Sequence, residues 1–171
     1  MQDFVHLHVH TQYSLLDGQA SVARLVDKAM QNGMKGIAVT DHGNMFGIKE
    51  FTNYVNKKNS GPKGEVKDLK KRIAGIEAGT IECADKEAEI AACKAKIVEA
   101  ENKLFKPVIG CEMYVARRTM DLKEGKPDQS GYHLIVLAKN EKGYHNLIKL
   151  VSHAWTRGYY MRPRTDRSER S

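Results

Sequence analysis

Two histidines near the start of the chain, His8 and His10, have the type and spacing of a metal chelate. They lie in FVHLHVH (4–10), where residues alternate with the period of two that a β-strand requires. The alternation predicts a strand that carries both imidazoles on one face, where two neutral imidazoles can chelate a divalent cation. Histidines on strands are also common on ordinary surfaces. The interpretation of this pair as a metal site is therefore strengthened only if other candidate ligands lie nearby.

Further carboxylate and imidazole side chains follow at predicted turns and strand ends. Asp17 precedes Gly18, whose freedom at a tight turn could return the carboxylate toward the histidines, although an Asp-Gly pair can also be a plain turn. GIAVT (36–40) predicts a short buried strand, and Asp41 and His42 come directly after it. Barrel enzymes place their sites at the carboxyl ends of such strands.

Two more candidates belong to the second half of the chain. Glu112 lies within the apolar stretch 106–116, which predicts a strand, and a buried carboxylate is costly unless it is paired or bound to a metal. His133 opens the predicted strand 133–138. A simple parallel barrel would place His133 at the opposite end from the other candidates, so its position is not explained by the strand pattern.

The elements around these residues indicate an α/β fold. Ser21 is the predicted N-cap of a helix that Gly33 ends, and a second helix is expected from about Met45 to about Lys57. Asn140 is the predicted N-cap of a later helix. The order β-α-β-α is typical of a parallel sheet or barrel.

The middle of the chain, residues 58–104, has a different pattern. After a turn-forming cluster at SGPKG (60–64), apolar residues recur at alternating spacings of three and four, first in residues 66–76 and then in residues 90–104. Two such seams separated by a break near Gly79 predict an antiparallel helical hairpin. We interpret it as an insertion between two parts of one domain, residues 1–57 and 105–171.

Composition and charge limit the class of protein. The 171 residues suffice for one globular domain, with 41% hydrophobic and 29% charged residues. No apolar run approaches the roughly 20 residues of a membrane span, and no secretory signal begins the chain, so a cytoplasmic location is expected. The net charge of +7 comes mainly from residues 57–106 and 139–171. This excess suits either a polyanionic partner or a solvated lysine-rich surface. Cys83, Cys93 and Cys111 form no CxxC pair, which favours reduced thiols.

Six stretches of the chain resemble one known family. HVHTQYSLLDG and VTDHG resemble the first two motifs of the PHP (polymerase and histidinol phosphatase) superfamily. The others resemble the alpha subunits of bacterial replicative DNA polymerases, and they are GNMFG, FKPVIGCEMYVA, HLIVLAKNEKGYHNLIKLVS and RGYYMRPRTD. Together they cover nearly the whole chain outside residues 58–104.

The resemblance implies a distorted (β/α)7 barrel that holds up to three divalent metal ions, whether zinc, manganese or iron. The implied metal ligands are His8, His10, Asp17, His42, Glu112 and His133. Clustered metals would make the domain a phosphoesterase, with 3′–5′ exonuclease proofreading as the implied activity. The full-length protein would synthesise DNA on a template. Its implied partners are DNA, a separate proofreading subunit, the sliding clamp and the clamp loader, with no membrane.

Some alternatives stay open at this stage. The domain could instead be a metal-stabilised docking platform for a proofreading subunit, or a phosphatase of the histidinol-phosphate type. The remaining family ligands would lie beyond Ser171, so the chain is expected to be the first part of a longer barrel and inactive alone. His6 is expected in the core, whereas His145 and His153 are expected at the surface or an interface. Four arginines could contact DNA phosphate or simply be solvated, and they are Arg117, Arg118, Arg162 and Arg164.

Overall fold

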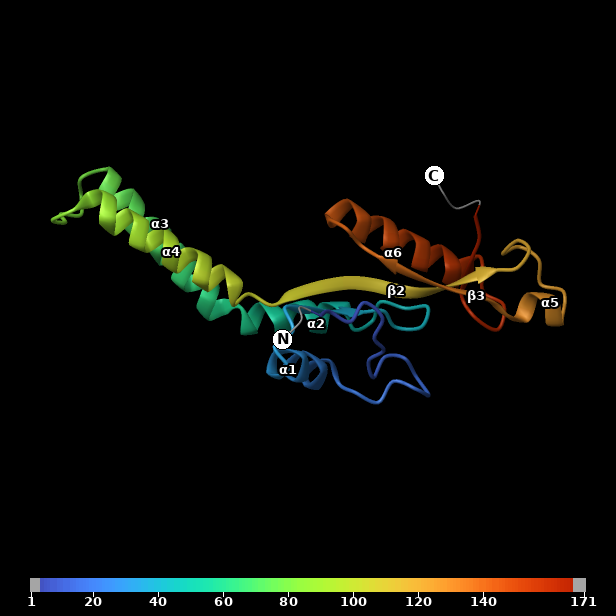
Figure 1. Ribbon diagram of the computed structural model, residues 1–171. Helices are drawn as coiled ribbons and strands as arrows, with labels where there is room; N and C mark the ends of the chain where they lie inside the picture. The colour runs from blue at the N-terminus through green and yellow to red at the C-terminus, as the bar shows by residue number, and fades with distance from the viewer. Residues whose placement is uncertain (1–3, 168–171) are drawn as a thin grey trace. The chain divides into compact units, whose positions relative to one another are not determined.

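The computed structural model describes residues 4–167, which form two compact units (Figure 1). One unit contains the described residues up to Asn53 together with those from Pro107 onward, and the other is Tyr54–Lys106. Within the described part of the chain, no helix combines the length and apolar character that crossing a membrane requires.

The first unit is a mixed α/β structure built around one long strand, β2 (Lys106–Ala116). On one side of β2 lie β1 (Gly36–Val39) and the short β4 (Arg164–Thr165), and on the other side lies β3 (Gly131–Leu137). The chain just past β1 pairs with β2 in parallel, and β4 is also parallel to β2. The expected α/β class with parallel pairing is therefore present around β2.

Strand β3 runs antiparallel to β2, from Gly110 opposite Leu137 to Ala116 opposite Gly131. The connection between the two strands contains only the four-residue helix α5 (Lys126–Gln129), which is too short to cover a face of the sheet as a crossover helix does. The parallel sheet or barrel that the β-α-β-α order indicates therefore does not extend to β3. Its reversed direction brings the first residues of β3 beside the last residues of β2.

Two helices cover this sheet. Helix α1 (Val22–Gln31) packs against β1, and the Ser21 hydroxyl accepts a hydrogen bond from its first turn as the sequence predicts. Helix α6 (Glu141–Thr156), capped by Asn140, lies over β2 (Figure 1). Its contact with β2 forms a buried apolar core of Cys111, Met113, Leu147, Val151 and Ala154. Burial in this core raises the pKa of the Cys111 thiol to about 12.

Residues 4–10 run beside β1 but do not form the strand that their alternation predicts. The backbone N–H groups of Ala38 and Thr40 donate to the carbonyls of His6 and Val9. Two residues along β1 therefore match three residues of the segment, which bends at Leu7. The extra residue interrupts the ladder as a bulge does.

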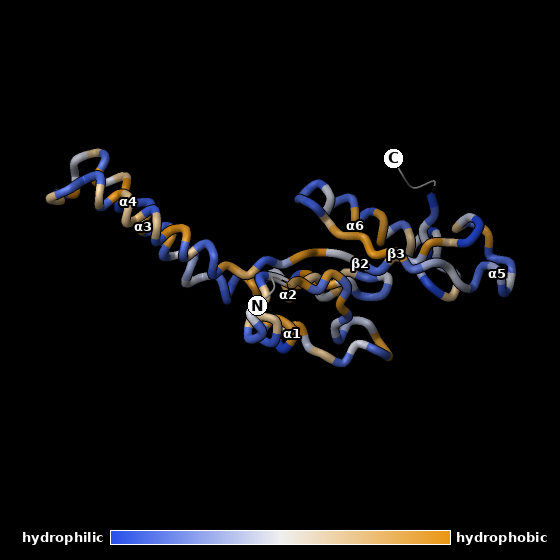
Figure 2. Tube along the Cα trace, in the orientation of Figure 1, coloured by the Kyte–Doolittle hydropathy of each residue, from blue (hydrophilic) through white to orange (hydrophobic). Residues whose placement is uncertain are grey.

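The second unit contains the end of α2 (Ile48–Lys58) and two long helices, α3 (Ser60–Glu77) and α4 (Lys86–Asn102), which pack against each other. Along both helices hydrophobic positions recur among polar ones (Figure 2). The predicted turn at residues 60–64 is instead the first turn of α3, where Pro62 is tolerated because early helical N–H groups need no partner.

The side chain of Asn59 closes the base of the helical pair. It donates to the Phe105 carbonyl oxygen at 2.8 Å and accepts from the Phe105 N–H at 2.9 Å. Both residues are buried. This reciprocal pair holds together the two points at which the chain enters and leaves the helical pair.

Candidate metal centre

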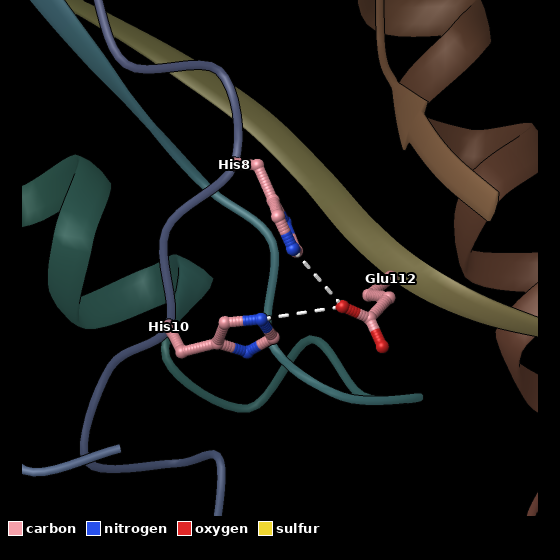
Figure 3. Close-up of side chains that lie close together, drawn as sticks. All are labelled: His8, His10 and Glu112. Carbon is pink, nitrogen blue, oxygen red and sulfur yellow. Dashed lines mark ion pairs between the residues drawn. The ribbon is translucent and has the colours of Figure 1, made fainter. Parts of the chain in front are cut away.

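The carboxylate of Glu112 is the centre of a cluster of histidines in the first unit. Its Oε2 lies 3.2 Å from Nε2 of His8 and 3.2 Å from Nε2 of His10 (Figure 3). These three side chains offer ligand atoms within 4.8 Å of one another. Glu112 is only 2% exposed, so a carboxylate that would be costly if isolated is surrounded by imidazoles.

The other oxygen of Glu112 faces two further histidines. Its Oε1 lies 2.8 Å from Nδ1 of His42 and 2.9 Å from Nδ1 of His133. The second nitrogen of His42 lies 2.7 Å from Oδ2 of Asp17. All six residues that the family resemblance implies as ligands are therefore brought into one cluster, with two imidazoles at each oxygen of Glu112.

Strand pairing fixes the centre of this cluster. Glu112 N–H donates to the Asp41 carbonyl, and Gly43 N–H donates to the Glu112 carbonyl, so His42 is held directly beside Glu112. His133 reaches the same place because β3 is antiparallel, with His133 opposite Tyr114 on β2. The strand direction thus explains the one candidate whose position the sequence pattern left unexplained.

The loop from Thr11 to Gly18 carries Asp17 to the cluster. Gly18 N–H donates to the Ser14 carbonyl at 2.7 Å, and a Cβ atom at Gly18 would lie 1.8 Å from the Thr11 carbonyl oxygen. Only glycine permits this approach. The predicted return of the Asp17 carboxylate toward the histidines is therefore built into the loop.

Asp41 holds the loop in place and does not face the imidazoles. Its buried carboxylate accepts hydrogen bonds from the Thr11 N–H at 2.6 Å, the Thr11 hydroxyl at 2.8 Å and the Ser14 hydroxyl at 2.7 Å. Three donors compensate a buried charge that would otherwise be strongly unfavourable. Asp41 therefore positions Ser14, which contacts His10, and the backbone of the loop at Thr11.

Hydroxyl groups determine which nitrogen of His10 and His8 is free. Ser14 gives its proton to Asp41, so its oxygen can only accept from Nδ1 of His10, at 2.9 Å. Thr40 gives its proton to the Val9 carbonyl, so it likewise accepts from Nδ1 of His8, at 3.0 Å. In the neutral form of each ring, this arrangement directs an Nε2 lone pair at the Glu112 carboxylate.

The Nε2 lone pairs of His8 and His10 and the Glu112 carboxylate face one another. A cation between these three groups would offset their mutual repulsion. Burial, and secondarily the neighbouring His42, lower the pKa of His10, which disfavours a proton as that cation. A divalent metal ion suits the set, since neutral imidazole nitrogens and a carboxylate oxygen are its usual ligands. Close to this set, the hydrogen bond from His42 lowers the pKa of Asp17 and keeps it ionised.

Sequence reasoning missed Ser14 and Thr40, whose hydroxyls contact His10 and His8, and Thr11, whose hydroxyl donates to Asp41. The sequence signal was their position, because each is a polar residue within a motif that carries a candidate ligand. In the structure all three are buried. The expectation of a core position for His6 is wrong, since its side chain is exposed and contacts the Phe4 ring. The bend at Leu7 separates it from the cluster.

Comparisons with known proteins agree with these motifs. The DNA polymerase III subunit alpha of Borreliella burgdorferi is 39% identical over 169 residues, which is 97% of this chain and 11% of that subunit. The corresponding subunit of Treponema pallidum is 39% identical over 164 residues, 95% of this chain and 10% of the subunit. The chain spans about a tenth of the length of these relatives. Residues 6–170 match the family described as PHP domain, and the chain therefore belongs to the PHP domain family.

Proposed function

We propose that this chain is the N-terminal PHP domain of a bacterial replicative DNA polymerase, and that the domain is a metal-dependent phosphoesterase acting on 3′ ends of DNA. The observation that carries the proposal is Glu112, a buried carboxylate that receives two imidazoles at each of its oxygens. The similarity to the alpha subunits of Borreliella and Treponema supports the polymerase context.

The residues divide into ligands and residues that orient them. His8, His10 and Glu112 would hold one divalent cation, and Glu112 would be shared with a second group of ligands, His42, His133 and Asp17. Such a cation would supply an activated water molecule and offset the negative charge that develops on a phosphodiester. Thr40 and Ser14 keep the Nε2 lone pairs of His8 and His10 directed toward the cation.

In the complete protein, this domain would remove mispaired nucleotides from the 3′ end while template-directed synthesis takes place elsewhere in the subunit. DNA and the other replicase subunits, including a proofreading subunit, the sliding clamp and the clamp loader, would be its partners in the cytoplasm. The names of the relatives support this assignment, as does the basic charge of residues 139–171.

The function is tested by removing the two chelating histidines together. In the complete protein, His8→Ala with His10→Ala should release at least part of the bound metal and abolish manganese-dependent degradation of single-stranded DNA from its 3′ end. Elemental analysis and an end-labelled oligonucleotide assay measure the two effects. The matched control is His145→Ala with His153→Ala, which replaces two exposed histidines of α6. Unchanged metal content in the first variant would rule out the site, whereas metal binding without degradation in the unsubstituted protein would favour the docking platform.

We also propose that residues 58–104 are an insertion that the metal centre does not require. Replacing residues 61–103 by a short Gly/Ser turn keeps the Asn59–Phe105 hydrogen bonds and should leave the metal content and cooperative unfolding of the remainder intact. The same replacement with Asn59→Ala is the sensitive comparison, because it leaves the Phe105 backbone groups without partners. Loss of cooperative unfolding in the first variant would mean that the helical pair belongs to the core of the domain.

A further inference from the structure

The segment after α6 folds back toward the metal centre through a tight turn. The Tyr160 N–H donates to the Arg162 carbonyl at 3.1 Å, and Met161 between them has a φ angle of 62°. A non-glycine residue in this left-handed region costs free energy and persists only where its surroundings impose it. Contacts with the rest of the protein, rather than the local backbone preference of Met161, must therefore hold this turn in place.

Packing against the residue beside His42 fixes the turn. A Cβ atom added to Gly43 would lie 2.7 Å from Cγ of Pro163, so the Pro163 ring contacts the Gly43 backbone directly. The Gly43 carbonyl also accepts a hydrogen bond from Trp155 Nε1 at 2.8 Å. The turn is thus fastened to the stretch of chain that carries His42.

The turn presents the guanidinium of Arg162 beside the histidines. Its Cζ lies 4.9 Å from the centre of the Tyr114 ring, and its Nη1 donates to the Tyr114 hydroxyl at 2.6 Å. The Tyr114 ring in turn stacks near His42, with centroids 6.2 Å apart, and meets His133 edge-on at 5.1 Å. Only one aromatic ring therefore separates this cation from two residues of the centre.

Arg162 differs from two other exposed arginines of the unit, Arg118 and Arg157, because those two are neutralised by carboxylates. Arg118 pairs with Asp128 and Glu124, and Arg157 pairs with Asp121. For exposed Arg162, residues 4–167 provide no carboxylate within ion-pair distance. Its ring contact orients the planar fork but leaves most of its N–H donors available, which suits two-pronged recognition of a phosphate.

We infer that Arg162 binds non-bridging oxygens of the phosphoryl group that the metal centre acts on, with Tyr114 holding the guanidinium in place. The inference rests on the proposed function for the identity of the ligand. A metal centre must neutralise an anionic substrate, and a fixed guanidinium at its edge both attracts that anion and orients it. The phosphate class follows from the fork geometry and positive charge of the side chain.

The test measures phosphate binding separately from turnover. Calorimetric titration of the manganese-loaded complete protein with inorganic phosphate should give a Kd that rises about 10- to 100-fold in Arg162→Gln, as expected for losing hydrogen bonds to a charged group. Arg162→Lys should recover part of this loss. The matched control is Arg117→Gln, because Arg117 is also exposed and also lies over a tyrosine ring, that of Tyr132. This control should leave the Kd unchanged.

Metal content and thermal unfolding, measured for each variant, should not change. The inference is overturned if the unsubstituted protein binds no phosphate, if Arg162→Gln and Arg117→Gln bind it equally well, or if Arg162→Gln loses metal. Arg162-dependent phosphate binding by a protein that never degrades DNA would instead contradict the proposed nuclease function and leave the role of Arg162 standing.

Discussion

Replacing Glu112 with glutamine is expected to weaken divalent-metal binding by more than about 100-fold, since losing even an outer-shell partner of a metal ligand costs about 10- to 100-fold. Glutamine has nearly the same shape, but it is neutral and replaces one oxygen by an NH2 group that cannot donate a lone pair. At least two of the four imidazoles around Glu112 would then lose their carboxylate oxygen.

Titration of the metal-free protein with manganese and zinc, followed by elemental analysis, measures this effect. Glu141→Gln is the control, because Glu141 is an exposed carboxylate at the start of α6, and its replacement should leave the affinity unchanged. The metal-free Glu112→Gln protein should still unfold cooperatively. Retention of metal at normal affinity would mean that Glu112 is only a hydrogen-bond acceptor for the histidines.

Replacing Arg164 with methionine is expected to give the largest loss of folding stability. Arg164 is 1% exposed, and its guanidinium donates to four backbone carbonyls, those of Gly158, Asp128, Met120 and Leu122. Methionine fills similar space without any donor. Each buried carbonyl left without a partner costs about 1–3 kcal/mol, so the free energy of unfolding should fall by about 3 kcal/mol or more.

Urea denaturation of the complete domain measures that change. Arg157→Met is the control, since Arg157 and Asp121 form an exposed ion pair and such pairs contribute little. Arg164→Lys should be intermediate, because an ammonium group cannot span carbonyls that come from separate segments. An Arg164→Met protein with unchanged stability would show that solvent or a rearranged loop satisfies these carbonyls.

The sequence singled out the side chains that cluster around Glu112, but it did not predict the geometry that brings them together. Residue type and position at strand ends identified His8, His10 and His42 as candidates, since strand ends in α/β folds gather functional side chains. Glu112 was identified because a carboxylate inside an apolar strand is costly to bury. For His133 only the family resemblance supplied a role. The direction of β3 depends on the long-range pairing with β2, which no local period encodes.

Two other expectations from the sequence, the strand at 4–10 and the role of Arg164, were wrong. A single extra residue beside β1 turns the regular strand expected at 4–10 into a bent segment, although the alternation of side chains is perfect in the sequence. Arg164 was expected to meet phosphate or solvent, and it is instead buried among carbonyls. An arginine that satisfies backbone groups has the same sequence signature as one that binds a nucleic acid.

The reciprocal hydrogen bonds between Asn59 and Phe105, here called the Asn59–Phe105 clamp, have a consequence for how the chain folds. His42 and Glu112 must meet across 70 residues, and closing so long a loop slows the search for the native pairing. Helices α3 and α4 contact each other locally and can form early, and the clamp at their base spans 46 of those residues. Once it has formed, the effective separation falls to about a third, which lowers the entropic barrier to pairing β1 with β2 by about 1 kcal/mol. A segment that contributes no ligand to the centre can thereby speed its assembly.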